Sequence, residues 1–194
     1  MEPTRPSKPR LLLFAFGDFA FNIYWQSVML FLLFYYTDAL DIPIAVAATT
    51  YMIASIWDGL ASFAVGALVD RRHETLKYGV IMIAGAVPLG LCFMLAYLPP
   101  GGTGPLAIAG ILGAHLLFRT AYAAVNVPYL AMTARISADA GDRAFVAGMR
   151  MLFGTAAAVV VALCTVPLGR WLTGSTASEA YFAVAIAGAV VGGT

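Results

Sequence analysis

Charged residues are scarce in this sequence. Only 11% of its 194 residues are Asp, Glu, Lys or Arg, whereas 61% are hydrophobic; soluble domains have about 25% and about 45–50%. So few charges cannot cover the surface of a water-soluble domain of this size, which excludes a soluble fold. The formal net charge of +1 gives no global field that would attract nucleic acid, and we expect no nucleic-acid partner.

Cysteines and catalytic motifs are scarce as well. Cys92 and Cys164 lie inside apolar runs, which predicts buried, inert thiols rather than a disulfide or a metal site. The patterns CxxC, HExxH, GxxxxGK[ST] and GxSxG do not occur in the sequence. The two histidines, His73 and His115, have no spacing that favours a metal site. We therefore expect neither an enzyme nor a metal or cofactor other than a coupling ion.

Long hydrophobic runs are what the sequence has instead. A membrane-spanning helix needs about 20 predominantly apolar residues, and six such runs, the last incomplete, are joined by short links. They predict an all-α, polytopic membrane helix bundle. The expected helices cover residues 11–36, 44–69, 78–98, 106–133, 144–168 and 180–194, after an N-terminal tail of residues 1–10. The first run is too long for the apolar core of a signal peptide, about 7–15 residues, which predicts a retained helix.

Positive charges in the tail and the links indicate the orientation of the bundle. One side carries Arg5, Lys8, Arg10, Arg71, Arg72, Lys77, Arg135 and Arg143. The other side carries Arg170, opposed by Asp38, Asp41 and Glu179. Because cytoplasmic loops are rich in Lys and Arg, we expect a cytoplasmic N-terminus in a plasma or bacterial inner membrane.

Polar residues inside three of the expected helices recur at steps of three and four, so that each set lies on one helix face. The sets are Asp18, Asn22, Gln26 and Met29; Tyr51, Ser55, Asp58 and Ser62; and His115, Arg119, Tyr122 and Asn126. A charged group in hydrocarbon costs at least about 2.5–3.5 kcal/mol, so such residues face a protein interior or a water-filled space. The three faces predict one shared polar cavity.

Two interpretations of these polar residues stay open. They would line a transport pathway, or they would only join helices by hydrogen bonds. Either Asp18 or Asp58 would neutralise Arg119, and Trp25 would stack on a substrate. Arg150 would extend to the cytoplasmic side or enter the cavity.

Several short motifs resemble a known family when they are taken together and in order. They are Gly17-Asp18-Phe19 with Asn22, Phe34-Tyr35-Tyr36-Thr37-Asp38, Ile56-Trp57-Asp58, Asp70-Arg71-Arg72, Asn126-Val127-Pro128-Tyr129, and Asp139 to Arg143 followed by Arg150. This series resembles the N-terminal half of the glycoside–pentoside–hexuronide:cation symporters of the major facilitator superfamily. The resemblance implies a transporter with twelve helices in two halves, with the substrate bound between them.

The resemblance and the polar helix faces together give the candidate site residues. The substrate-binding candidates are Asp18, Asn22, Trp25, Arg119, Tyr122 and Asn126. The cation-coupling candidates are Asp58 and Ser62, and the cytoplasmic gating candidates are Asp70, Arg71, Asp139, Arg143 and Arg150.

The sequence departs from the family pattern around the expected cation site. Ser55 and Ser62 stand where the family has an Arg and a second Asp, and Arg119 stands where a small residue is usual. A Na⁺ site of two carboxylates is therefore not expected. Proton coupling through Asp58, or an anionic substrate held by Arg119 in a bidentate pair, are the two remaining interpretations.

The function expected is that of half of a secondary active transporter for a sugar, glycoside or sugar acid, coupled to H⁺ or Na⁺. The partners expected are a small sugar-like molecule, the lipid bilayer, and either a C-terminal six-helix half or a second copy of the chain. The alternative is a relative of the lysolipid facilitators, or a membrane scaffold without transport. A cavity lined by polar residues would distinguish the first from the second.

Overall fold

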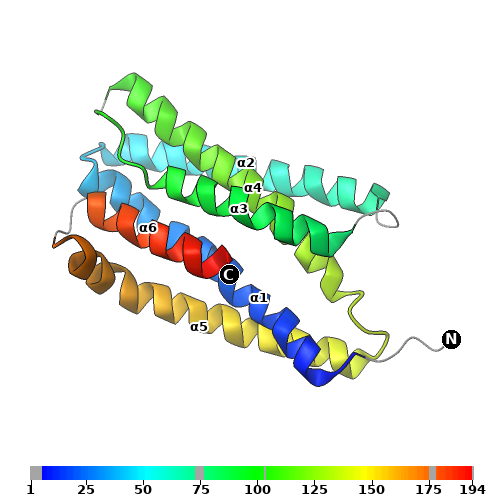
Figure 1. Ribbon diagram of the computed structural model, residues 1–194. Helices are drawn as coiled ribbons and strands as arrows, with labels where there is room; N and C mark the ends of the chain where they lie inside the picture. Colours follow the sequence, from blue (N-terminus) through cyan, green and yellow to red (C-terminus); the bar gives the residue numbers. More distant parts are fainter. Residues whose placement is uncertain (1–5, 73–76, 103, 175–177, 194) are drawn as a thin grey trace.

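The computed structural model describes residues 6–72, 77–102, 104–174 and 178–193, and in these ranges the chain is built of helices and links, without a strand. The elements are α1 (Lys8–Ser27), η1 (Val28–Leu32), η2 (Tyr35–Ala39), α2 (Ile44–Arg72), α3 (Tyr78–Ala96), α4 (Pro105–Thr133), α5 (Ala140–Thr173) and α6 (Ser178–Gly193). Successive helices run in alternating directions along one bundle (Figure 1). The expected all-α helix bundle is confirmed.

Among the described residues, four helices, α2 to α5, are long and apolar enough to cross a membrane. Helix α6 is shorter, and its last described residues lie partway along the bundle (Figure 1). Helix α1 runs on into η1 and η2, so that helical backbone covers the first expected run. Many large apolar side chains on the outer faces are exposed, among them Phe63, Ile83 and Leu163, as expected for helices that contact lipid.

The π-helical segments η1 and η2 distinguish the end of the first helix from an ordinary α-helix. Here Tyr35 and Tyr36 are fully buried. The hydroxyl of Tyr35 donates to the carbonyl oxygen of Tyr97 at 2.8 Å, and the Tyr97 hydroxyl donates to the carbonyl oxygen of Ser27 at 2.8 Å. These bonds tie the first helix to the end of α3. Few helices contain π-helical turns, and those turns often lie at functional sites. The end of the first helix therefore has a backbone geometry of a kind associated with function.

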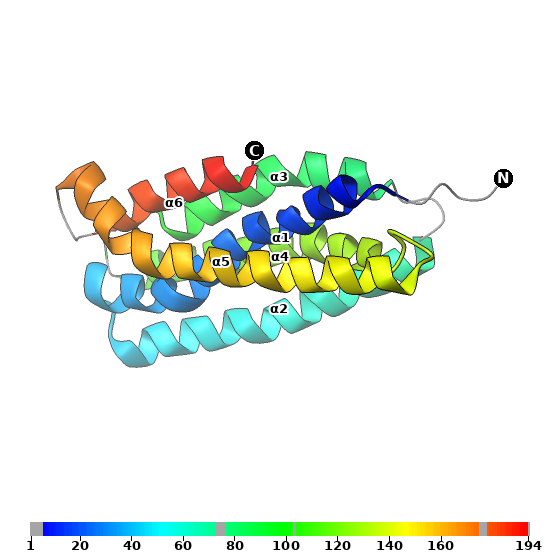
Figure 2. The same ribbon diagram turned by 90° about the horizontal axis from the view of Figure 1, so that it is seen from below.

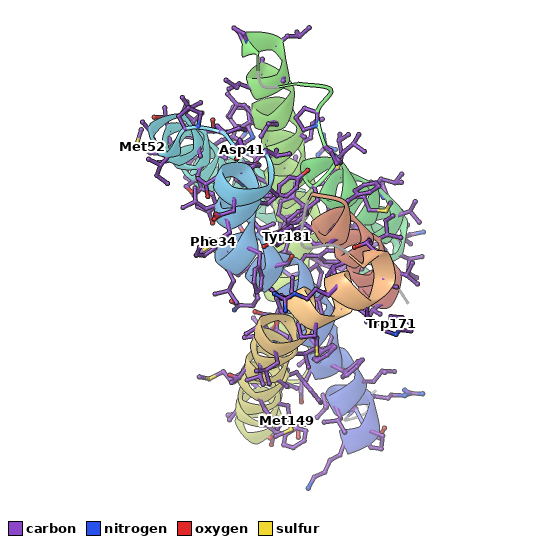
Figure 3. The ribbon with its side chains drawn as sticks, turned by 90° about the vertical axis from the view of Figure 1, so that its left-hand side faces the viewer. Phe34, Asp41, Met52, Met149, Trp171 and Tyr181 are labelled. Atoms are coloured by element: carbon purple, nitrogen blue, oxygen red, sulfur yellow. The ribbon has the colours of Figure 1, made fainter. Side chains whose placement is uncertain are left out.

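The helices pack in a defined pattern: α1 lies on α5, α2 and α3 lie on α4, and α6 contacts α5, α3 and α1. Figure 2 shows α2 on one side of α1, α4 and α5, and α3 with α6 on the other. Buried aromatic side chains of α1, η2, α3 and α4 form the main core. In Figure 3, Tyr181 of α6 points into the bundle, whereas Phe34, Met52 and Trp171 lie on its outer faces.

The observed helix ends differ from the expected ones in several places. Helix α1 begins inside the expected tail, because Pro9 is suited to the first turn of a helix. Helix α2 continues to Arg72, and α5 runs from Ala140 to Thr173, beyond the expected 144–168. Residues 1–5 of the tail and residue 194 lie outside the described residues.

Both cysteines are free thiols, and the expectation of burial is wrong for one of them. Cys92 is partly buried, whereas Cys164 is exposed on α5. An exposed thiol in an apolar segment is explained by the position of α5 at the surface of the bundle. Apolar runs in a membrane protein cover lipid-facing positions as well as core positions, so hydrophobicity alone does not predict burial within the chain.

Candidate functional site

A polar cavity of about 310 Å³ lies between α1, α2, α4 and α5. Its lining residues are Asp18, Asn22, Trp25, Asp58, Ser62, Tyr122, Asn126, Leu130 and Arg150. The three polar helix faces predicted from the sequence therefore meet around one space. A larger hollow of about 520 Å³ near the α3–α4 link is lined by apolar, proline and glycine residues, and it offers little for recognition of a polar ligand.

On the α1–α5 side of the cavity, Asp18 forms an ion pair with Arg150. The Nε and Nη2 atoms of Arg150 donate to Oδ1 of Asp18 at 3.0 and 2.9 Å. Nη1 of Arg150 donates to the Thr133 hydroxyl at 2.8 Å, and its guanidinium lies 4.9 Å from the ring centre of Tyr129. Arg150 therefore enters the cavity, which decides between the two positions expected for it.

Asn22 lies one helical turn after Asp18 and is held by it. The Asn22 amide donates to the Asp18 carbonyl oxygen at 2.9 Å and to its carboxylate at 3.2 Å. The Asn22 oxygen accepts a 3.5 Å bond from Gln26. Because Asn22 and Asn126 both line the cavity and an amide both donates and accepts, the pair is suited to hydroxyl groups.

On the α2–α4 side, Asp58 pairs with Arg119. Nη1 of Arg119 lies 3.7 Å from Oδ2 of Asp58, and the Arg119 side chain is only 2% exposed. Its Nε donates to Nε2 of His115 at 3.2 Å. The guanidinium lies 4.7 Å from the ring centre of Trp25 and 5.7 Å from that of Tyr51, in the range of cation–π contacts.

Arg119 therefore lies behind the cavity wall rather than in it. Trp25 and Asp58 line the cavity and contact Arg119. Of the two carboxylates expected to neutralise Arg119, Asp58 does so and Asp18 pairs with Arg150 instead. His115 is fully buried, and its other ring nitrogen lies 3.4 Å from the Tyr36 hydroxyl, which makes it a packing residue with both nitrogens hydrogen-bonded.

The gating candidates other than Arg150 lie at the end of the bundle where α1 begins (Figure 1). Asp70 and Arg71 are exposed in the last turn of α2. Asp139 caps α5, accepting from the backbone N–H of Asp142 at 2.9 Å. Arg143 donates to the carbonyl oxygens of Ser137 and Ala138 at 3.0 and 2.8 Å. Asp139 and Arg143 order the α4–α5 link, and none of these four residues lines the cavity.

Two residues at the cavity were not among the candidates named from the sequence: Leu130, which lines it, and Gly154 of α5, which allows α5 to approach α1 beside it. A Cβ atom at this position would lie 3.0 Å from the Asn22 amide nitrogen and 3.2 Å from Oδ2 of Asp18. Glycine within a membrane-spanning helix ordinarily allows close helix packing, which gave no reason to name Gly154 as a site residue. Its spacing of four residues from Arg150 places both on one face of α5, and this spacing was the available signal.

We expect Gly154→Ala to displace Asn22 and Asp18. The new methyl group meets polar atoms already fixed by hydrogen bonds, so we expect a loss of about 1–3 kcal/mol in the free energy of unfolding, as for other overpacked sites. Gly148→Ala on the same helix is the matched control, because a Cβ there has open space. Unfolding in detergent measures both variants, and equal stability of the two would contradict the close approach.

The sequence matches a known family and several curated transporters. Residues 13–192 match the family described as "MFS/sugar transport protein". The chain is 30% identical to the "Uncharacterized symporter YnaJ" of Bacillus subtilis, over 86% of this chain and 36% of the relative. It is 30% identical to the "Inner membrane symporter YicJ" of Escherichia coli, over 83% and 35%. It is 24% identical to the "Isoprimeverose transporter" of Lactiplantibacillus pentosus, over 92% and 38%.

The chain spans little more than a third of the length of these relatives. The relatives are symporters and transporters, and they confirm the resemblance to the glycoside–pentoside–hexuronide symporters. Since the described part of the chain has four helices long and apolar enough to cross a bilayer, the chain is a multi-pass membrane protein. It belongs to the MFS/sugar transport protein family, to whose model nearly its whole length aligns.

Proposed function

We propose that this chain is the N-terminal half of a secondary transporter that moves a sugar, glycoside or sugar acid together with H⁺ or Na⁺. Its partner in the membrane is a C-terminal six-helix half or a second copy of the chain, and the substrate is bound between the two halves. Transport proceeds by rocking of one half against the other. The protein lies in the plasma or inner membrane with its N-terminus in the cytoplasm.

The polar cavity between α1, α2, α4 and α5 is the observation that carries this proposal. It combines two asparagine side chains, Asn22 and Asn126, with the tyrosine hydroxyl of Tyr122 and the flat ring of Trp25. Amides and hydroxyls bond to sugar hydroxyls in either direction, and an aromatic face covers the apolar side of a sugar ring. Specific small-molecule sites combine a few oriented polar groups with such apolar surface.

The charges around the cavity favour recognition through hydroxyl groups. Asp18 and Asp58 each have an arginine partner within the bundle, Arg150 and Arg119. An anionic group of a substrate would reach Arg119 only after Trp25 or Asp58 moved, since both stand between Arg119 and the cavity. The neutral hydroxyl groups of a glycoside can bind in the cavity without any movement of Trp25 or Asp58.

The alternative functions, a lysolipid facilitator or a scaffold without transport, require a different environment for the polar residues. In a scaffold they would be closed off by packing, and for a lipid the lining would be mainly apolar. Asp18, Asp58 and Asn126 instead line the cavity together, whereas Arg119, the fourth residue on which this distinction depends, is buried behind the cavity wall. This arrangement supports the sugar transporter over both alternatives.

Uptake by the complete reading frame tests the proposal. Membrane vesicles containing the protein are given labelled glycosides and uronates, with and without an imposed H⁺ or Na⁺ gradient. We expect gradient-driven accumulation of at least one of these sugars, and Asp58→Asn should reduce accumulation at least about tenfold, equivalent to about 1.4 kcal/mol. Exchange of substrate without a gradient controls for folding of the variant. Unchanged accumulation by Asp58→Asn would refute the role of Asp58.

A further inference from the structure

The carboxylate of Asp58 contacts the polar cavity on one side and Arg119 on the other. It lines the polar cavity together with Ser62, one helical turn further along α2. It also faces Arg119 of α4 at 3.7 Å. Carboxylate and hydroxyl oxygens are ligands of hard cations, so the cavity side of Asp58 is suited to a small cation. The opposite side already holds a cation that belongs to the chain.

The pair between Asp58 and Arg119 is loose. At 3.7 Å it is longer than a charge-assisted hydrogen bond, about 2.7–2.9 Å, whereas Arg150 approaches Asp18 to 2.9 Å. The Nη2 atom of Arg119 is buried and has no hydrogen-bond partner among the described residues. Buried polar groups in stable structural ion pairs normally have all their hydrogen bonds made. The Asp58–Arg119 pair does not meet this condition, because one donor group of the guanidinium has no acceptor in the described part of the chain.

Arg119 is held in place by contacts that do not depend on Asp58. His115 accepts from its Nε at 3.2 Å, and the rings of Trp25 and Tyr51 lie against its guanidinium. A second cation at Asp58 would therefore not release Arg119 into water. It would bind a few ångströms from a fixed positive charge, and repulsion between like charges is strong in a site of low dielectric constant.

We propose that Arg119 is a tethered competitor for a monovalent-cation site formed by Asp58 and Ser62. The guanidinium neutralises Asp58 from the protein side and keeps the affinity of the cavity side for a free cation low. This inference rests on the proposed function, because it assigns to Arg119 the setting of ion affinity in the symporter. Arg119 acts through Asp58 and is a positioning residue, not a ligand of the ion.

Sodium binding to the purified complete protein tests the inference. Na⁺ replaces choline at constant ionic strength, and thermal unfolding in detergent reports binding. Arg119→Gln is expected to increase the apparent Na⁺ affinity at least about tenfold, because 1.4 kcal/mol of relieved repulsion corresponds to that factor. Arg119→Lys keeps the charge and should retain the low affinity. Arg170→Gln is the matched control, since Arg170 is exposed near the end of α5.

Adding Asp58→Asn to Arg119→Gln should abolish the increase in Na⁺-dependent thermal stability. This result would locate the bound ion at Asp58. An equal Na⁺ response of the parent protein and Arg119→Gln would overturn the inference, as would a gain that survives Asp58→Asn. Arg119→Met, which fills a similar volume without charge, is used if the glutamine variant does not fold. Glycoside binding is measured in the same preparations. Absence of glycoside binding would refute the proposed function, whereas the effect of Arg119→Gln on Na⁺ affinity tests the role of Arg119 independently.

Discussion

Asp18→Ala is expected to lower the free energy of unfolding by about 1–3 kcal/mol, the range for leaving a partly buried hydrogen-bonding partner unsatisfied. The Arg150 side chain is only 17% exposed and its Nε and Nη2 atoms both donate to the Asp18 carboxylate. Removal of the carboxylate leaves an uncompensated guanidinium inside the bundle. Chemical unfolding of the protein in detergent measures the loss.

The double variant Asp18→Ala with Arg150→Met separates the charge effect from simple loss of packing. With both charges removed, no buried ion lacks a partner, and apolar replacements of buried pairs are often neutral. We expect the double variant to recover most of the stability while glycoside binding stays weak, because Asn22 has lost the carboxylate that orients it. A double variant as unstable as Asp18→Ala would contradict this account.

Trp25→Ala is expected to weaken glycoside binding at least about tenfold, as truncation of a central aromatic residue does in other binding sites. Trp25 lines the cavity, its ring centre lies 5.2 Å from that of Tyr122, and its face covers Arg119. Its removal takes away the flat surface on which a sugar ring would lie. Equilibrium binding of a labelled glycoside to the complete protein gives the dissociation constant.

Trp171→Ala is the matched control for this substitution, because Trp171 is 80% exposed on the outer face of α5 (Figure 3). It should bind glycoside as the parent protein does. Trp25→Ala also opens Arg119 toward the cavity, so a uronate should lose less affinity than a neutral glycoside if an anion can reach that guanidinium. Unchanged glycoside affinity in Trp25→Ala would remove Trp25 from the site.

The cavity was predictable from the sequence because its lining follows helix periodicity. Asp18 and Asn22, like Tyr122 and Asn126, are four residues apart, and in a membrane such polar faces must avoid lipid. The pairing of charges was only partly predictable. Asp18 and Arg150 lie 132 residues apart, and nothing local to either residue indicates which arginine neutralises which carboxylate.

Other features lay beyond the sequence for different physical reasons. The π-helical turns η1 and η2 contain no glycine or proline that would mark them, and they depend on tertiary contacts such as that of Tyr35 with Tyr97. The exposure of Cys164 depends on which neighbours cover α5. Apolar side chains are equally stable in contact with lipid and in contact with other helices. The sequence pattern therefore could not distinguish lipid-facing positions from buried ones.

Both ion pairs of the cavity join helices that already pack on each other, α1 with α5 and α2 with α4. Between these two helix pairs, α1 meets α4 through ring contacts, those of Trp25 with Tyr122 at the cavity and of Phe21 with Tyr129 in the core. A change in the width of the cavity would therefore move aromatic surfaces past one another while each ion pair stays within its own helix pair. The charged contacts that such a movement would break are those of Arg119 with Trp25 and of Arg150 with Thr133.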